Sequence, residues 1–329
     1  MSTLLLLKKC VLHQPFDLKC LPPSFFSKYY LRGRKTIHGE VTVYAHELLR
    51  KSEKIEGELK NQQYVLAWCT ELILSYFLIV DDIEDGASSR NGQPCWHLLA
   101  DVGSLAGNDA SMLRSFIMQL LHINFSSQLF VDFAKLFNEV FFICNVGQHL
   151  DATTSKNRNY DNFTMENYKN IAPDLRKNDF TDYYDDDEQT GKTGSDIQAG
   201  KCTWLAVSAL QRCSPAQREE FVAHYGSWQP DHVARIRDIY QQLGIVDIYF
   251  REEQATYDRI IKKIESLPAN AVPSADFFKT VVDAYYPNVT CGKSLTLSKR
   301  PPQKQKKVLS QDAYSSFINS LPVIIDKGV

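Results

Sequence analysis

The sequence lacks several features that mark common classes of protein. Its 37 basic and 39 acidic residues leave a formal net charge of -2, so no positive field indicates nucleic acid as a partner. No two cysteines form a C-x-x-C pair, which argues against a zinc site or a disulfide framework and favours a reducing compartment. The cysteines are instead scattered along the chain: Cys10, Cys20, Cys69, Cys95, Cys144, Cys202, Cys213 and Cys291.

Long hydrophobic segments of the targeting kind are also missing. The start, MSTLLLLKKC, contains a leucine run that is too short for a signal-peptide core or a membrane span. Residues 1–35 contain Asp17 as their only acid, a feature shared with transit peptides. We therefore expect a cytoplasmic protein without stable membrane insertion, and a mitochondrial location is the second expectation.

Signals for β-strands are few, whereas apolar residues recur at helical spacing. Hydrophobic residues make up 44% of the 329 residues and charged residues 23%, as in globular proteins. The stretch YVLAWCTELILSYFLIV (64–80) is apolar nearly all round, which predicts a central helix. Further helical spacing covers residues 40–60, 108–152, 201–213, 215–225 and 232–265. The pattern predicts an all-α bundle.

The two ends of the chain differ from this helical part. Residues 1–32 form a short stretch with several prolines, so we expect a divergent N-terminal segment. Residues 33–286 form the expected helical domain. Residues 287–329 contain the basic run KRPPQKQKK and show no sustained periodicity. We expect this tail to be largely disordered.

The central apolar helix ends in a dense group of acids, DDIED (81–85). Asp81 and Asp85 are four residues apart and therefore project from the same helix face. Carboxylates paired at the mouth of an apolar pocket suit Mg²⁺, which takes oxygen ligands and often bridges to diphosphate. A solvated acidic helix end is the alternative, but the helix dipole opposes negative charge at a C-terminus. The pattern favours a metal site.

A second acidic stretch, NDFTDYYDDDE (178–188), would by itself favour a solvated loop. The segment that follows, TGKTGSDIQAGKCTW (190–204), places Lys192 and Lys201 among glycines, which is typical of a diphosphate-binding loop. It is not a P-loop, because Asp186 stands where that motif needs its first glycine. The lysines therefore raise the prospect that the acids before them bind a metal.

Together these stretches resemble the trans-isoprenyl diphosphate synthases, and within them the farnesyl diphosphate synthases. The matching stretches are GRKTIHG (33–39), WCTEL through DDIED to CW (68–96), GQHLD (147–151), ENYKNI (166–171), NDFTD (178–182), TGKTGSDIQAGKCTW (190–204) and IYQQLGIVDIYFREEQATYDRIIKKI (239–264). The resemblance covers residues 33–286. It implies the isoprenoid synthase helical bundle, a homodimer, and facing aspartate-rich helices that bind an allylic diphosphate through three Mg²⁺ ions, with Mn²⁺ as the alternative ion.

The resemblance also assigns roles to individual residues. The implied metal ligands are Asp81, Asp85, Asp151, Asn178 and Asp182. The implied catalytic groups, which bind metal or neutralise the departing diphosphate, are Asp81, Asp82, Asp85, Arg90, Lys192 and Lys201. The implied substrate-binding residues are Lys35, Leu74, Tyr76, Phe77, Arg90, Gln148, Lys192 and Lys201. Asn178 stands where the family has an aspartate, so we expect weaker metal binding on that side.

Two aromatic residues before the acids bear on the length of the substrate. Tyr76 and Phe77 lie five and four residues before Asp81, where bulk limits chain length in the family. Their faces also suit cation–π stabilisation of a carbocation, although simple core packing is an equal interpretation for either one. We expect a fifteen-carbon farnesyl substrate, with a ten-carbon geranyl substrate second.

The family's second substrate site, for isopentenyl diphosphate, carries over poorly. Lys35 remains, but His38 and Asn91 stand where the family has arginines, and Leu74 stands in place of a glutamine. Each lost arginine–phosphate contact removes on the order of a few kcal/mol where it is desolvated. We therefore expect a terpene synthase, similar to the insect enzymes derived from farnesyl diphosphate synthase, that forms a sesquiterpene or other terpene.

Two alternatives remain open. The first is a prenyltransferase that condenses isopentenyl diphosphate with an allylic diphosphate. The second is a non-catalytic truncated isoform or subunit, because only APDLRK (172–177) joins ENYKNI to NDFTD. The family has a long helical passage there, so some helices between residues 171 and 178 are expected to be missing.

Overall fold

The computed structural model describes residues 36–50, 55–90, 92–171, 176–184, 195–286 and 309. The predictions for residues 1–32, Lys35, Asn91 and Lys192 lie outside this part of the chain. Of the expected tail, only Leu309 is described, and it is buried against the core formed by the first helices. The domain boundaries therefore stay a prediction.

Helices form almost all of the described structure, which confirms the all-α prediction. The first group consists of α3 (Ile37–Leu49), α4 (Gly57–Asp85), α5 (Ala106–Asn124) and α6 (Ser127–Asn157). The second consists of α7 (Met165–Ile171), α8 (Arg176–Tyr184), α10 (Asp196–Ala199), α11 (Trp204–Leu210), α12 (Pro215–His224), α13 (Pro230–Gln242), α14 (Ile245–Glu265) and α15 (Ala275–Tyr285). Strands β1 (Ser89–Arg90) and β2 (Gln93–Pro94) form a small antiparallel hairpin after α4.

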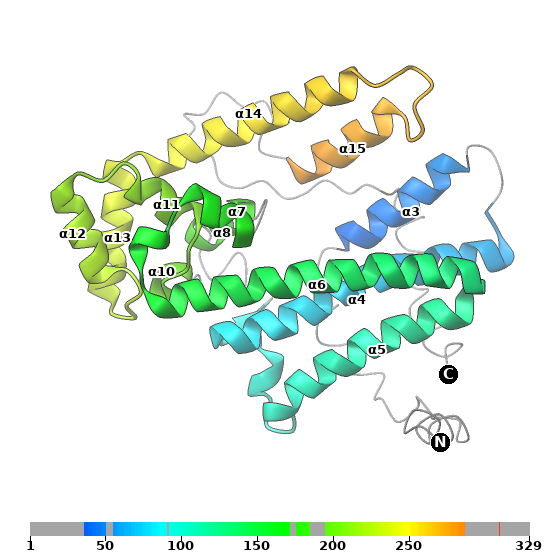
Figure 1. Cartoon of the computed structure of the whole chain (residues 1–329), viewed down its shortest axis with the longest axis horizontal. Helices are drawn as coiled ribbons and strands as arrows, with labels where there is room; N and C mark the ends of the chain where they lie inside the picture. Colours follow the sequence, from blue (N-terminus) through cyan, green and yellow to red (C-terminus); the bar gives the residue numbers. More distant parts are fainter. Residues whose placement is uncertain are drawn as a thin grey trace, which may run out of the picture.

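The apolar helix α4 lies at the centre of the first group, packed against α3, α5 and α6 (Figure 1). Trp68, Leu72 and Ile79 are among its fully buried side chains. Burial of a large apolar side chain contributes about 1.5–3 kcal/mol, so this face anchors the bundle. At its end, Gly86 adopts φ 62°, and the N–H groups of Gly86 and Ala87 donate to the last carbonyls of α4. This left-handed residue ends the helix directly after Asp85.

By length and composition, α4 is also the one helix of the described residues that is apolar enough to cross a membrane. In the structure, 56% of its most apolar window is buried inside the protein. Its buried face lies against neighbouring helices, which is the usual arrangement of a core helix.

Aromatic residues form the core of the second group and fix α8 in place. Phe180 of α8 stacks on Tyr249 of α14 with ring centroids 4.0 Å apart, and Trp204 of α11 meets the same tyrosine edge-on. These contacts hold the second acidic motif against the helices that follow it. Only residues 172–175, which lie outside the described part, separate α7 from α8.

The contact between α6 and α7 depends on a glycine. A Cβ atom added at Gly147 would lie 2.6 Å from the carbonyl oxygen of Ile171, the last residue of α7. Backbone atoms of two packed helices have little room to separate, so this position excludes any side chain.

We predict that Gly147→Ala destabilises the protein by about 1–3 kcal/mol, because overpacking forces the backbone of α7 away from α6. Urea unfolding followed by circular dichroism measures the change. Gly107→Ala is the matched control, since a Cβ there meets nothing within 4 Å. Equal stability of the two variants would show that the contact is not tight.

Candidate active site

The ammonium group of Lys201 lies among three carboxylates from two helices. Lys201 Nζ is 2.6 Å from Asp85 Oδ2, 3.3 Å from Asp151 Oδ2 and 4.0 Å from Asp81 Oδ1. The lysine side chain is 12% exposed and that of Asp85 is 11% exposed. Groups that are far apart in the sequence thus meet at the end of α4, where the DDIED (81–85) and GQHLD (147–151) stretches share one site.

Arg90 supplies a second positive charge beside the same acids. Its Nη2 lies 2.7 Å from Asp81 Oδ2, and its Nε donates to Asp82 Oδ1 at 2.7 Å. The Asp82 side chain is fully buried, which makes the guanidinium its counter-ion. The β1–β2 hairpin turns the chain back over the end of α4 and so brings Arg90 to these carboxylates. Arg90 therefore orders the acidic motif from one side while Lys201 orders it from the other.

The backbone around Lys201 is held by its neighbours. Gly200 adopts φ 71° after the short helix α10, a conformation that favours glycine. Tyr225 donates its hydroxyl hydrogen to the Lys201 carbonyl at 2.7 Å, and Gly226 N donates to Ile197 O at 2.9 Å. A Cβ at Gly200 would lie 3.1 Å from Gly226 Cα, so the two segments touch through their glycines. The position of Lys201 is thus set by the α12–α13 connection.

Burial controls the electrostatics of this cluster. It raises the pKa of Asp85 to about 6, with Lys201 opposing the rise and Asp81 adding to it. Burial alone would lower the pKa of Lys201, but the nearby carboxylates, Asp151 first, raise it well above its ordinary value. The site therefore contains a firmly positive lysine and an aspartate that benefits from additional positive charge.

The second acidic motif is divided between surface and interior. Asn178 is exposed, whereas Asp179 is buried and accepts a hydrogen bond from Trp204 N at 2.8 Å. Asp182 Oδ2 accepts a hydrogen bond from Asp196 N at 3.0 Å. As the described residues stand, no three of their His, Cys, Asp or Glu side chains are close enough together to hold a metal ion. The structure places Asp81, Asp85 and Asp151 together and assigns backbone contacts to Asp179 and Asp182.

The aromatic residues before the acids pack toward α6. The Tyr76 hydroxyl donates to Asn145 Oδ1 at 3.1 Å, and the rings of Tyr76 and Phe77 both meet Phe141, at 5.0 Å and 5.7 Å between centroids. Gln148 Nε2 donates to the Phe77 carbonyl at 3.0 Å. Both aromatic residues are half-buried, so packing is one role that the structure gives them.

The positions that differ from the family's isopentenyl site lie on α3 and α4. His38 is 42% exposed, and its Nδ1 lies 3.9 Å from Oε1 of the fully buried Glu71. The same oxygen accepts a hydrogen bond from Gly39 N at 2.7 Å. Leu74 is half-buried one turn further along α4. An imidazole beside a carboxylate therefore stands where the family has a guanidinium.

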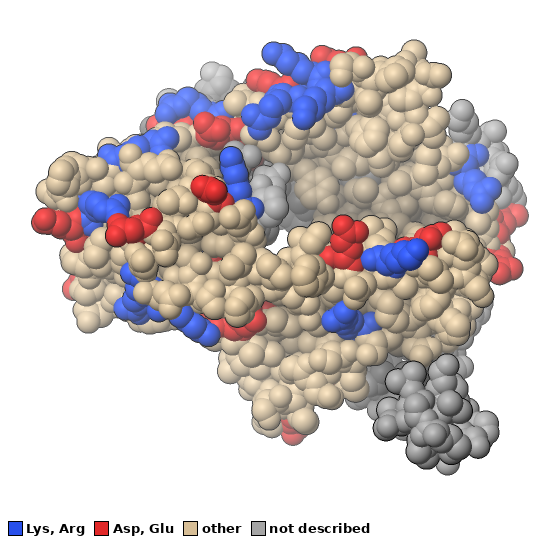
Figure 2. All heavy atoms as spheres, viewed as in Figure 1, with Lys and Arg blue, Asp and Glu red and all other residues tan. Residues whose placement is uncertain are grey.

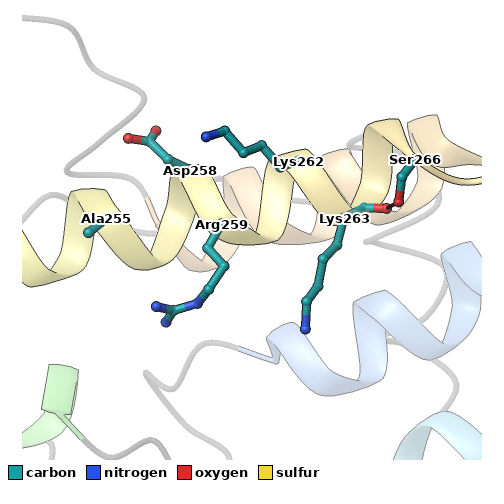
Figure 3. Close-up of a pocket in the computed structure, with 6 residues that line it drawn as sticks. All are labelled: Ala255, Asp258, Arg259, Lys262, Lys263 and Ser266. Carbon is teal, nitrogen blue, oxygen red and sulfur yellow. Dashed lines mark hydrogen bonds between the residues drawn. The ribbon is translucent and has the colours of Figure 1, made fainter.

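Figure 2 shows that the viewed face is hollowed between the α14 side and the α6 side. A hollow of about 530 Å³ follows one face of α14. Figure 3 shows that Arg259 and Lys263 extend to one side of α14 and Lys262 to the other. The residues that line the hollow are Ala255, Asp258, Arg259, Lys262, Lys263 and Ser266. None of the residues predicted from sequence lines this hollow.

Several residues that hold the site in position were not predicted from the sequence. Tyr225 and Gly226 contact the Lys201 segment but belong to no motif with recognisable chemistry. Asp179 lies within NDFTD, yet its contact with the start of α11 was not predicted. Phe141 was likewise not predicted, although it lies under both Tyr76 and Phe77.

The comparisons with known proteins agree with this architecture. The family model "Polyprenyl synthetase" matches residues 24–174 and 177–243, which is more than half of the chain. The chain therefore belongs to the polyprenyl synthetase family, which supports an enzyme that uses prenyl diphosphates. The match is interrupted between α7 and α8, at the junction where the sequence predicts missing helices.

Named relatives are farnesyl pyrophosphate synthases. The one from Nezara viridula is 30% identical over 74% of this chain and 70% of its own length. Farnesyl pyrophosphate synthase 2 of Arabidopsis thaliana is 30% identical over 74% of this chain and 84% of its own. The structure of the T. brucei farnesyl diphosphate synthase with a bisphosphonate is 26% identical, with a TM-score of 0.74 over 86% of this chain and 95% of that one.

We predict that Asp179→Asn stabilises the protein increasingly as the pH rises. Burial raises the pKa of Asp179 to about 7, from 3.8 for an ordinary aspartate. Between these values the unfolded chain releases the proton before the folded one, so wild-type stability falls as pH rises. The variant, which does not titrate, should gain on the order of 3 kcal/mol relative to wild type between pH 4.5 and pH 8.

Urea unfolding at several pH values measures this difference. Asp132→Asn, at an exposed position on α6, is the control and should show little dependence on pH. A difference between Asp179→Asn and wild type that stays constant across the range would mean that the buried carboxyl is ionised throughout.

Proposed function

We propose that this chain uses Mg²⁺ to ionise an allylic prenyl diphosphate. The observation that carries the proposal is the convergence of Asp81, Asp85 and Asp151 on the Lys201 ammonium group, with Arg90 beside them. Positive groups next to a carboxylate cluster suit a substrate that is itself an anion bound through metal ions. Family membership supports the same class of substrate.

The carboxylates at the end of α4 are oxygen donors of the kind that Mg²⁺ takes, and the Lys201 ammonium group lies among them. Burial raises the pKa of Asp85, so a positive charge placed beside this carboxylate would stabilise its ionised form. Asp81 and Asp85 would hold the ion, with Asp151 nearby, while Asn178 and Asp182 are the proposed ligands from the facing helix. Bound Mg²⁺ supplies charge that stabilises the leaving diphosphate.

The residues of the chain then have separate tasks. Lys201 and Arg90 neutralise the phosphate oxygens as the carbon–oxygen bond breaks, and Lys192 is proposed to do the same from outside the described part. Asp82 keeps the Arg90 guanidinium in place through its buried contact. Tyr76 and Phe77 are proposed to line the prenyl chain and limit it to ten or fifteen carbons, with farnesyl diphosphate favoured.

Two fates of the carbocation remain as candidates. The names of the relatives favour prenyl transfer, in which isopentenyl diphosphate attacks the cation and the chain grows. The residues His38 and Leu74 favour the second candidate, a terpene synthase, because neither offers the fork of donors that binds a second diphosphate. In that case the carbocation is attacked by a double bond of the same chain, loses a proton or is attacked by water.

The exposed surface of α6 bears on how the chain assembles. On α6, Leu136, Phe142 and Ile143 are large apolar side chains that are more than half exposed, Phe142 at 68%. Exposed apolar faces of this kind mark protein interfaces, so we propose a homodimer through α6. A monomeric mass in sedimentation would contradict it.

We further propose a cytoplasmic location without stable membrane insertion.

Release of pyrophosphate tests the proposal. With farnesyl or geranyl diphosphate, isopentenyl diphosphate and Mg²⁺, we predict that Asp85→Asn lowers the rate of release by about 100-fold or more, because it removes a charge that positions the metal. The matched control is Glu84→Gln in the same motif, whose side chain is exposed and which should keep nearly full activity. Equal rates for the two variants would refute the role of Asp85.

The same assay without isopentenyl diphosphate separates the two fates. Prenyl transfer predicts that release depends on this co-substrate and that mass spectrometry finds a chain five carbons longer. A terpene synthase predicts undiminished release from the allylic substrate alone and a hydrocarbon or alcohol product. Release under neither condition would support the non-catalytic alternative and contradict the proposed ionisation.

A further inference from the structure

Two histidines face each other at the connected end of the α12–α13 helical hairpin. His224 is the last residue of α12, and His232 lies in the first turn of α13. Their ring centroids are 4.6 Å apart and their planes are nearly perpendicular. The two helices lie side by side at one end of the molecule (Figure 1), and an ion pair between Glu220 and Arg235 joins them one turn further along.

One nitrogen of each ring already has a partner. His224 Nδ1 lies 2.7 Å from the Glu220 carbonyl, which only accepts, so the neutral ring donates from Nδ1 and has its lone pair on Nε2. His232 Nδ1 lies 2.9 Å from Ser227 Oγ. This hydroxyl can accept a hydrogen bond from a neutral ring that carries its proton on Nδ1, which again places the lone pair on Nε2. Histidines that bind metal ions almost always donate their other nitrogen to a carbonyl or similar group. Both rings thus have the outer contacts of metal ligands.

The distance between the ring centroids is also compatible with a shared ion. At a metal–nitrogen length of about 2.1 Å, two imidazoles in adjacent positions have ring centres about 4.5 Å apart for a 90° angle and about 5.2 Å apart for a tetrahedral angle. The observed 4.6 Å corresponds to the smaller angle. We propose that His224 and His232 bind a divalent transition-metal ion through Nε2, with Ni²⁺ and Cu²⁺ preferred to Zn²⁺.

Solvent completes the coordination in this proposal. Both histidines are half-buried, so part of each side chain is accessible to water. Within the described residues no third His, Cys, Asp or Glu joins them in a metal-binding group. Square or octahedral coordination by nitrogen and water is typical of Ni²⁺ and Cu²⁺. The site is separate from the acidic cluster, where Mg²⁺ is proposed to bind through carboxylate oxygens.

The segment that such an ion would hold supports the candidate active site. Between the two histidines lie Tyr225, whose hydroxyl donates to the Lys201 carbonyl, and Gly226, whose N–H donates to Ile197. An ion bound at both ends of this connection stabilises the folded hairpin by mass action, and with it the backbone of the Lys201 segment. The site therefore has a structural role that does not depend on the proposed activity.

Calorimetric titration of the full chain with Ni²⁺, in saturating Mg²⁺, tests the site. Ni²⁺ is preferred to Cu²⁺ as the probe because the exposed thiol of Cys144 reacts with copper. We expect one Ni²⁺ per chain and a melting temperature that rises with Ni²⁺. His224→Gln and His232→Phe should each weaken binding at least tenfold and abolish the rise.

The His232→Phe variant distinguishes a metal-binding role of His232 from a packing role, because phenylalanine keeps a ring against His224 but has no nitrogen. His122→Gln, at an exposed ring that contacts Phe130, is the matched control and should bind as the wild type does. The absence of saturable Ni²⁺ binding by the wild type, or unchanged binding by the His232→Phe variant, would overturn the proposal and leave the pair as an edge-to-face contact. Circular dichroism confirms that each variant is folded.

Discussion

The contact of one ammonium group with three carboxylates is the interaction on which the rest of the structure depends. Asp81, Asp85 and Asp151 repel one another where α4 meets α6, and partial burial makes that repulsion strong. Lys201 offsets it by bringing its own charge from the segment before α11. Two parts of the bundle, each with its own apolar core, are thereby linked through the same groups that would bind substrate. In the proposed function, the residues that hold the two parts together also carry the chemistry.

Much of this arrangement was predictable because strong local signals coincide with it. The stretch that is apolar on all sides is the buried helix α4, which ends at a left-handed glycine directly after the acids. Asp81 and Asp85 were predicted from one motif and Asp151 and Lys201 from two others, and the structure brings all four together. Charged residues are costly to bury, so an aspartate cluster beside an apolar helix indicates that cations lie close to it in the folded protein.

Contacts made by ordinary residues were not predictable. In the second acidic motif, the sequence favoured Asn178 and Asp182, yet Asp179 is the deeply buried member because Trp204 N needs an acceptor at the start of α11. Tyr225 supports Lys201 through a carbonyl oxygen, and backbone acceptors carry no sequence signature. His224 and His232 are eight residues apart across a turn, so no helical spacing reveals their proximity. Such pairings appear only once the chain has folded.

The most direct measurement is a double-mutant cycle between Asp85 and Lys201. The unfolding free energies of wild type, Asp85→Asn, Lys201→Gln and the double variant are compared in buffer containing a chelator. If the ammonium–carboxylate contact organises the site, the two substitutions are coupled by about 1–3 kcal/mol. Additivity within about 0.5 kcal/mol would show that the two charges act independently, and it would contradict an organising role for their contact.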